Sequence, residues 1–141
     1  MTSLVLKDSE LLNAACYIDG RWLSADNDAT LPVRNPATGS LIGTVPDMGV
    51  VETRRAIEAA TAAFATWRRR TAEDRSRLLR RWYELMVEHA EDLALLMTAE
   101  QGKPFAEARG EIAYAASYIE WFAEEAKRAY GETVPSPWND K

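Results

Sequence analysis

The spacing of apolar residues changes near Val50, and this change constrains the fold more than any other feature of the sequence. Beyond it, apolar residues recur every three or four positions, which is the spacing of one helix face. Before it, short extended runs alternate with turn-forming residues. The sequence therefore predicts hairpins over 15–46, helices over 50–130 and an extended tail over 131–141.

Two turn motifs organise the extended part. Asp19-Gly20 lies between two short apolar-rich arms, and Asp-Gly is a strong signal for a two-residue hairpin turn. The run Asn-Pro-Ala-Thr-Gly at 35–39 predicts a second turn, because Pro presets φ and Gly tolerates a positive φ. An isolated two-stranded hairpin is marginal in water, so we expect both hairpins to lie on other parts of the chain.

Start and stop signals divide the helical part into three or four helices. Thr71 with Asp74 three residues later resembles a capping box that opens a helix. Gly102 ends a further helix, and the proline two residues later starts the last one. We expect this last helix to cover 104–130.

Apolar stripes indicate which helix faces are buried. They comprise Ile57, Ala60, Phe64 and Trp67, then Leu78, Trp82, Leu85 and His89, and in the last helix Ala108, Ile112, Ala115, Ile119, Phe122 and Ala126. A second, aromatic stripe on the last helix consists of Tyr114, Tyr118 and Trp121. A helix that is apolar on two faces normally has protein on both sides.

Composition excludes several classes of protein. The net charge of -5 argues against a general affinity for nucleic acid, although seven of the 17 basic residues lie between 68 and 81. We interpret that arginine cluster as a solvated helix face. No apolar run exceeds five residues, the length of the run at 93–97, and such a run is too short to span a membrane. A single cysteine excludes an internal disulfide. We expect a cytoplasmic protein without nucleic-acid or membrane partners.

The chain carries no self-sufficient set of catalytic groups. It has neither the Gly-rich phosphate-binding patterns nor the Gly-x-Ser-x-Gly motif. Cys16 could be a nucleophile, but a small apolar residue before a strand is the preferred interpretation. His89 lies on an apolar stripe and is interpreted as a packed or capping residue. The polar run at 100–104 fits either a cation site or ordinary helix-stop chemistry.

Several segments together resemble one family. Tyr-Ile-Asp-Gly-Arg-Trp at 17–22, Asn-Pro-Ala-Thr-Gly at 35–39 and Glu-Gln-Gly-Lys-Pro at 100–104 resemble the N-terminal part of NAD(P)-dependent aldehyde dehydrogenases. The stretch 110–137 resembles the succinate- or glutarate-semialdehyde branch. The resemblance implies an α/β parent fold, within which this segment is mainly α-helical with one or two short N-terminal β-hairpins.

The resemblance implies an oxidoreductase that converts succinate semialdehyde to succinate with NAD or NADP. The family's catalytic cysteine, its glutamate and its nucleotide-binding segments lie downstream of the matched region. We therefore expect this chain to be inactive by itself, to bind no NAD or NADP alone and to hold no catalytic residue. The alternative is a non-catalytic helical interaction protein derived from the same framework.

The resemblance also implies three features of this segment. Glu100, with main-chain oxygens near Val33 and Arg34, would bind a structural cation, and the aromatic stripe at 114–121 would line the substrate entrance. Residues 132–137 would lead toward oligomerisation strands. Because the family's sheet is absent from this chain, the stripes of the last helix would be partly unburied, so we expect a homodimer.

Overall fold

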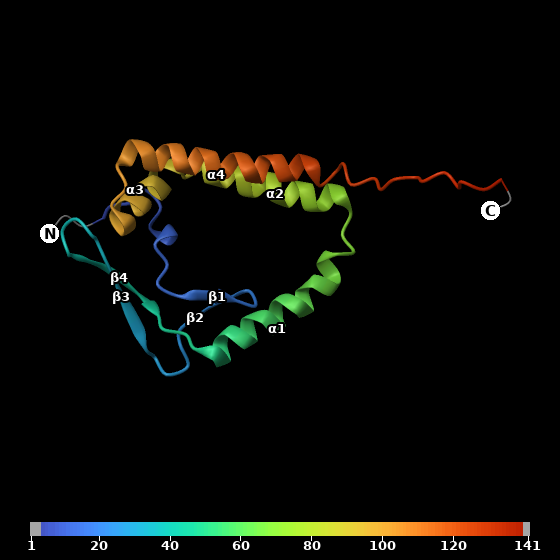
Figure 1. Cartoon of the computed structure of the whole chain (residues 1–141). Coiled ribbons are helices and arrows are strands. Elements are labelled where there is room, and N and C mark those ends of the chain that lie inside the picture. Colours follow the sequence, from blue (N-terminus) through green and yellow to red (C-terminus); the bar gives the residue numbers. More distant parts are fainter. Residues whose placement is uncertain (1–3, 140–141) are drawn as a thin grey trace.

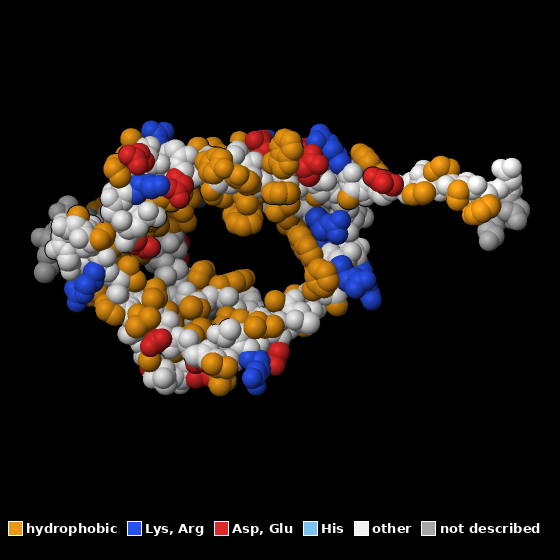
Figure 2. Space-filling model, viewed as in Figure 1, with side chains coloured by type: hydrophobic (Ala, Val, Ile, Leu, Met, Phe, Trp, Pro, Cys, Tyr) orange, Lys and Arg blue, Asp and Glu red, His pale blue; other side chains and the backbone are white. Residues whose placement is uncertain are grey.

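The computed structural model describes residues 4–139, and the arrangement of its elements in Figure 1 leaves a central opening that the space-filling view in Figure 2 also shows. Three helices form one layer, and a fourth lies across from them with two β-hairpins beside it. In chain order the elements are a 3₁₀ turn (Ser9–Leu11), β1 (Cys16–Ile18), β2 (Arg21–Leu23), β3 (Thr30–Arg34), β4 (Leu41–Pro46), α1 (Val50–Trp67), α2 (Ala72–Glu88), α3 (Ala90–Gln101) and α4 (Phe105–Glu125). The predicted mainly helical segment with two N-terminal hairpins is confirmed.

The first hairpin pairs β1 with β2 in antiparallel register, with Tyr17 opposite Trp22. Asp19 and Gly20 both adopt positive φ, 51° and 76°, as a tight two-residue turn requires. The rings of Tyr17 and Trp22 meet edge to face with centroids 5.2 Å apart. The hairpin tip faces a row of alanines on α1, whose short side chains allow close approach. This hairpin therefore has the support that its small size requires.

The second hairpin pairs β3 with β4, with an irregularity in register between Val33 and Arg34. Its turn is held by the Asn35 carboxamide oxygen, which accepts a hydrogen bond from the Ala37 N–H at 2.9 Å. Gly39 closes the turn with φ of 72°. Both predicted turns are thus confirmed.

The core of the helical layer is small and built mainly from alanine. Ala94 of α3 packs with Ala108 and Ile112 of α4, and Leu93 and Met97 border this cluster. The buried row of α4 consists of Ala108, Ile112, Ala116 and Ala123. Short side chains on this row let α2 and α3 approach α4 closely. Few large apolar side chains are therefore buried in this layer to stabilise it.

Three of the four residues in the apolar stripe predicted to be buried on α2 are exposed instead, whereas the fourth, His89, follows the helix and is half-buried. Leu78, Trp82 and Leu85 share a face as expected, but that face points away from α4. α2 packs against α4 through the opposite side, where Ser76 is buried and Tyr83 is half-buried. Helical spacing shows which residues share a face of the helix. It does not show which face packs against another helix.

The other predicted stripes require similar corrections. Ile57 and Phe64 of α1 are exposed, as are Ala115 and Phe122 of α4. Ala116 replaces Ala115 in the buried row, because the contact with α2 lies one residue further round the helix. Hydrophobic side chains consequently remain visible along both sides of the central opening (Figure 2).

α4 ends at Glu125, so the predicted helix over 104–130 is five residues too long at its C-terminal end. The N–H groups of Lys127 and Arg128 bond to carbonyls three residues back, which tightens the last turn and stops the helix before Gly131. The part of the predicted tail at 131–139 contains neither helix nor strand and extends away from the helices (Figure 1). Residues 140–141 lie outside the described residues. None of the described helices has both the length and the apolar character needed to cross a membrane.

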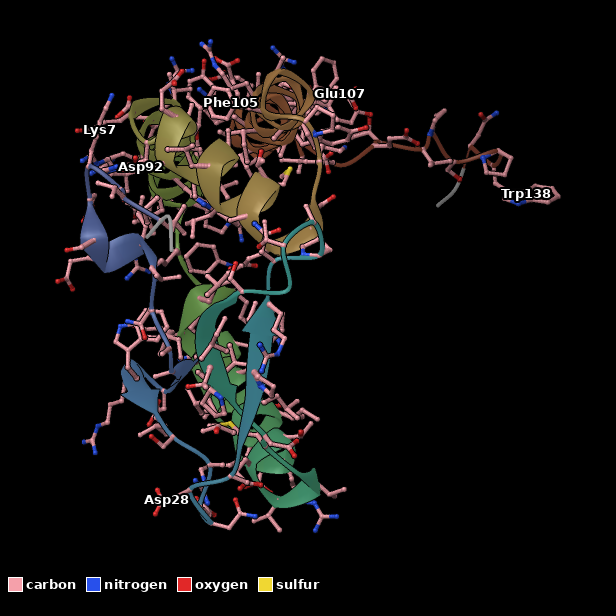
Figure 3. All side chains as sticks on the ribbon, turned by 90° about the vertical axis from the view of Figure 1, so that its left-hand side faces the viewer. Lys7, Asp28, Asp92, Phe105, Glu107 and Trp138 are labelled. Carbon is pink, nitrogen blue, oxygen red and sulfur yellow. The ribbon has the colours of Figure 1, made fainter. Side chains whose placement is uncertain are left out.

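Two buried carboxylates join segments that are distant in sequence. Asp92, in the first turn of α3, accepts hydrogen bonds from the N–H groups of Lys7 and Asp8 at 3.0 and 2.9 Å (Figure 3). Glu52, in the first turn of α1, accepts from the N–H groups of Asp26 and Gly49, both at 3.1 Å. Each carboxylate therefore satisfies main-chain donors and also lies near the positive end of a helix dipole.

An Asp92→Asn variant is expected to lower the Tm by several degrees at pH 7. It is also expected to weaken the hydrogen bonds that hold Lys7 and Asp8 against α3. The hydrogen bonds from Asp8 and Lys7 hold the pKa of Asp92 below its usual range. Because the folded pKa is lower than the unfolded one, this stabilisation is complete above the unfolded pKa. It is lost as pH falls through the folded value.

The Tm difference between wild type and Asp92→Asn should therefore shrink as pH falls below about 4, as calorimetry at several pH values would measure. Asp47→Asn, at an exposed position, is the matched control and should leave the Tm unchanged. A difference that stays constant down to pH 2.5 would contradict the assignment.

Candidate functional site

The aromatic side chains of α4 line an open groove of about 690 Å³. Tyr114, Tyr118 and Trp121 recur at spacings of four and three residues and therefore share one face, with Phe122 beside them. These four side chains are all exposed, because the buried row of α4 lies on the opposite side. The groove thus offers an apolar wall with hydroxyl groups at one end.

The two tyrosines of the groove form a fixed pair. Their hydroxyl oxygens lie 2.6 Å apart, and their rings meet edge to face with centroids 5.0 Å apart. The hydrogen bond with Tyr118 raises the pKa of Tyr114, so this hydroxyl stays protonated and acts as a neutral donor or acceptor. Such a pair suits the positioning of a polar group and does not supply a general base at neutral pH.

The carboxylates at the groove are paired with cations. Glu120 bonds to Arg80 of α2 at 2.8 Å, which joins the two helices at this point. Glu124 bonds to Lys127 at 2.8 Å, and this hydrogen bond lowers the pKa of Glu124. Because both ion pairs are exposed, each adds little to stability. Each of these two glutamates nevertheless has a cation as its partner.

The structure brings the predicted entrance residues together on one wall, where they are exposed. The prediction missed the other lining residues, which are Ser117, Glu120, Phe122, Glu124 and Arg128. Most of them lie three, four or seven positions from Tyr114 or Trp121, so helical spacing alone could have indicated them. Whether this groove meets a substrate stays a prediction.

The predicted cation site occupies the junction between α3 and the second hairpin. Glu100 is exposed in the last turn of α3, and the end of that helix reaches the turn that follows Arg34, since a Cβ on Gly102 would lie 3.0 Å from Pro36 Cγ. Arg34 directs its guanidinium to the Gly39 carbonyl at 3.1 Å. Residues 4–139 contain no cluster of three His, Cys, Asp or Glu side chains suited to a metal. A site with one carboxylate and main-chain oxygens, including those near Val33, stays a prediction.

The cysteine and the histidine lie on different elements. Cys16 is half-buried on β1, and His89 joins α2 to α3, where its Nδ1 lies 3.9 Å from a carboxylate oxygen of Asp8. The arginines at 68–70 are exposed at the end of α1, and Arg70 lies over the Trp67 ring at 5.8 Å. None of these contacts assembles a nucleophile with a base.

Comparison with known proteins shows which family this sequence resembles. The model of the aldehyde dehydrogenase family matches residues 22–141. Glutarate-semialdehyde dehydrogenase of Pseudomonas putida is 65% identical over 136 residues, which are 96% of this chain and 28% of that protein. Succinate-semialdehyde dehydrogenase [NADP(+)] of Escherichia coli is 56% identical over 136 residues, with the same coverage of 96% and 28%.

Solved structures share the arrangement of helices and hairpins. An NADP-dependent enzyme of Escherichia coli superposes with a TM-score of 0.94 at 55% identity, over 96% of this chain and 28% of that one. Betaine aldehyde dehydrogenase of Staphylococcus aureus, solved in complex with NAD+, gives a TM-score of 0.88 at 33% identity, over 93% of this chain and 26% of that one.

The chain thus spans little more than a quarter of the length of the relatives it matches. The matches to these relatives include 96% of the chain, whereas the family model begins at Trp22, within β2. On this evidence the chain belongs to the aldehyde dehydrogenase family and corresponds to the family's N-terminal segment.

Proposed function

We propose that this chain supplies the N-terminal segment of a dehydrogenase that oxidises a semialdehyde carrying a carboxylate at its other end. Succinate semialdehyde and glutarate semialdehyde are the candidate substrates, and the products are the corresponding dicarboxylates. The observation that carries the proposal is the high identity, over nearly the whole chain, to dehydrogenases named for these two compounds.

The described residues do not fit the nucleotide that such a reaction requires. Their sheets are two antiparallel hairpins, whereas dinucleotides bind where parallel strands end and a helix begins. Neither hairpin leads into a Gly-rich turn of the phosphate-binding type. We therefore assign the binding of NAD or NADP to polypeptide outside this segment.

Within this proposal, the aromatic groove of α4 lies along the path of the aldehyde. Trp121 and Phe122 would contact the methylene chain of the substrate and exclude water from it. The neutral Tyr114–Tyr118 pair would orient a polar end of the substrate through its hydroxyl groups. The contribution of this chain is then positioning, while the bond-making groups come from elsewhere.

A chimera tests the proposal. It joins this chain to the part of the Pseudomonas putida glutarate-semialdehyde dehydrogenase that follows the matched 136 residues. We expect the chimera to oxidise semialdehydes, as followed by the absorbance of the reduced nucleotide, with this chain inactive alone. Trp121→Ala in the chimera is expected to lower kcat/KM by about tenfold, because one good apolar contact is worth roughly that factor.

Trp22→Ala is the matched control for this variant. Trp22 is another exposed tryptophan, but it lies on the first hairpin and not on the groove. Equal kcat/KM values for the two variants would remove the groove from the substrate path. A folded chimera without activity on either semialdehyde would contradict the proposed function itself.

The exposed apolar faces of α1, α2 and α4 favour one alternative, a non-catalytic protein that forms homodimers through them. The oligomeric state of the isolated chain, measured by sedimentation, distinguishes the two functions when it is combined with the activity of the chimera. A stable dimer with an inactive chimera would favour the alternative.

A further inference from the structure

Acidic side chains line the aromatic groove of α4, and cations from outside the lining balance their charge. Glu120 and Glu124 belong to the lining, together with Arg128. The Arg128 guanidinium bonds to Glu125 at 2.5 Å, so its charge is already used by a carboxylate outside the lining. The net charge that a ligand meets in the groove therefore depends on the cations that pair with the two lining glutamates.

Arg80 of α2 is the cation that pairs with Glu120. Its Nη1 lies 2.8 Å from a carboxylate oxygen of Glu120. Its guanidinium carbon also lies over the ring of Tyr83, 5.0 Å from the ring centroid, which is a cation–π distance. The ion pair and the aromatic contact together hold this guanidinium beside the groove, although Arg80 is not one of the lining residues.

The same guanidinium acts on the second lining carboxylate. The hydrogen bond from Lys127 is the main reason that the pKa of Glu124 is lowered, and the positive charges of Arg128 and Arg80 add to this effect. The charge of Arg80 thus reaches across the groove from a different helix. It offsets negative charge at both lining glutamates.

This balance of charge matters for the class of substrate proposed above. Such a semialdehyde carries a carboxylate, which is ionised at neutral pH. A cleft with apolar walls concentrates the field of the charges around it, so a carboxylate without a cation would repel an anion there. Loss of Arg80 would leave Glu120 without the cation that now pairs with it.

We propose that Arg80 is a positioning residue that sets the charge preference of the groove, because its pairing with Glu120 admits an aldehyde that carries a carboxylate. This inference rests on the proposed function, in which the groove lies along the path of the aldehyde. Arg80 acts through Glu120 and does not contact the reacting atoms. Its loss is therefore expected to change KM more than kcat.

The experiment compares a charged and a neutral substrate in the chimera described above. The substrates are glutarate semialdehyde and its methyl ester, which keeps the aldehyde and the carbon chain but has no charge. Arg80→Met keeps an apolar stem and removes the positive charge. At low ionic strength we expect it to raise KM for the semialdehyde about three- to tenfold and to change KM for the ester less than about twofold. The difference should shrink at about 0.5 M salt, which screens exposed charges.

Arg81→Met is the matched control, because it removes the same charge from the next position on α2. Arg81 faces Glu84, a residue outside the lining of the groove, at 3.7 Å. We expect this control to leave both KM values within about twofold of the unsubstituted chimera. Arg80→Lys, which keeps the charge, should retain the preference for the semialdehyde. Adding Glu120→Gln to Arg80→Met should recover most of the loss, since it removes the carboxylate left without a cation.

The charged and neutral substrates separate an electrostatic role from a structural one. Equal losses on the semialdehyde and the ester would overturn the inference, as would a loss that neither salt nor Glu120→Gln changes. Either result would leave the proposed function intact, because the unsubstituted chimera would still oxidise the semialdehyde. An unsubstituted chimera that oxidises the ester but neither succinate nor glutarate semialdehyde would instead contradict the proposed function, and the inference would fail with it.

Discussion

Replacing Ile112 with Ala is expected to lower the free energy of unfolding by about 2–4 kcal/mol. Ile112 is 8% exposed and lies where α3 meets α4. Its buried neighbours Ala94 and Ala108 have no side-chain length with which to fill the space left by the substitution. Because small domains are marginally stable, a loss of this size removes a large part of the total.

Ile57→Ala is the matched control, because it makes the same chemical change on a helix at a position that is 61% exposed. We expect its effect to lie within about 0.5 kcal/mol of zero, since alanine also favours the helix slightly. Urea denaturation followed by far-UV circular dichroism measures both variants. Equal effects at the two positions would contradict a core centred on Ile112.

Local signals predicted the elements of this chain well. The Asp19-Gly20 turn, the run at 35–39 and the Thr71 cap each depend on a few adjacent residues, and all three occur as predicted. The end of α4 is the exception among the helix limits. The predicted end at residue 130 relied on Gly131 as the stop, whereas the helix tightens and ends five residues earlier, at Glu125.

The choice of buried face is not a local property, and there the prediction fails. α2 has apolar residues on two sides, and the set with Trp82 at its centre is the exposed one. The packed side uses Ser76, which no apolar pattern would indicate. A residue of modest hydrophobicity is buried here because α4 presents a row of alanines that requires a close neighbour.

The candidate site was predictable to the extent that it lies on one helix. Tyr114, Tyr118 and Trp121 share a face by spacing alone, and the structure keeps them together. The partner of Glu120 comes from α2, forty residues away, and Asp92 holds main-chain groups more than eighty residues away. Contacts at such separations depend on how the helices pack, so the sequence pattern contained no signal for them.

Gly102→Ala is expected to lower the free energy of unfolding by about 2 kcal/mol, for two separable reasons. Gly102 ends α3 with φ of 77°, a conformation that costs a side-chain-bearing residue roughly 1 kcal/mol or more. In addition, a Cβ at this position would lie 3.0 Å from Pro36 Cγ, which is closer than ordinary contact. The substitution would therefore push the end of α3 away from the second hairpin.

Gly39→Ala separates these two reasons, because Gly39 has nearly the same φ, 72°, with no atom within 4 Å of the added Cβ. We expect it to cost about 1 kcal/mol, so the difference between the two variants measures the contact with Pro36. In a double-mutant cycle, Pro36→Ala should recover part of the loss in Gly102→Ala and none of the loss in Gly39→Ala. Identical costs at the two glycines, or an absence of coupling to Pro36, would mean that α3 and the hairpin do not touch there. Since this contact also brings the end of α3 that carries Glu100 to the turn after Arg34, its loss would separate the two halves of the predicted cation site.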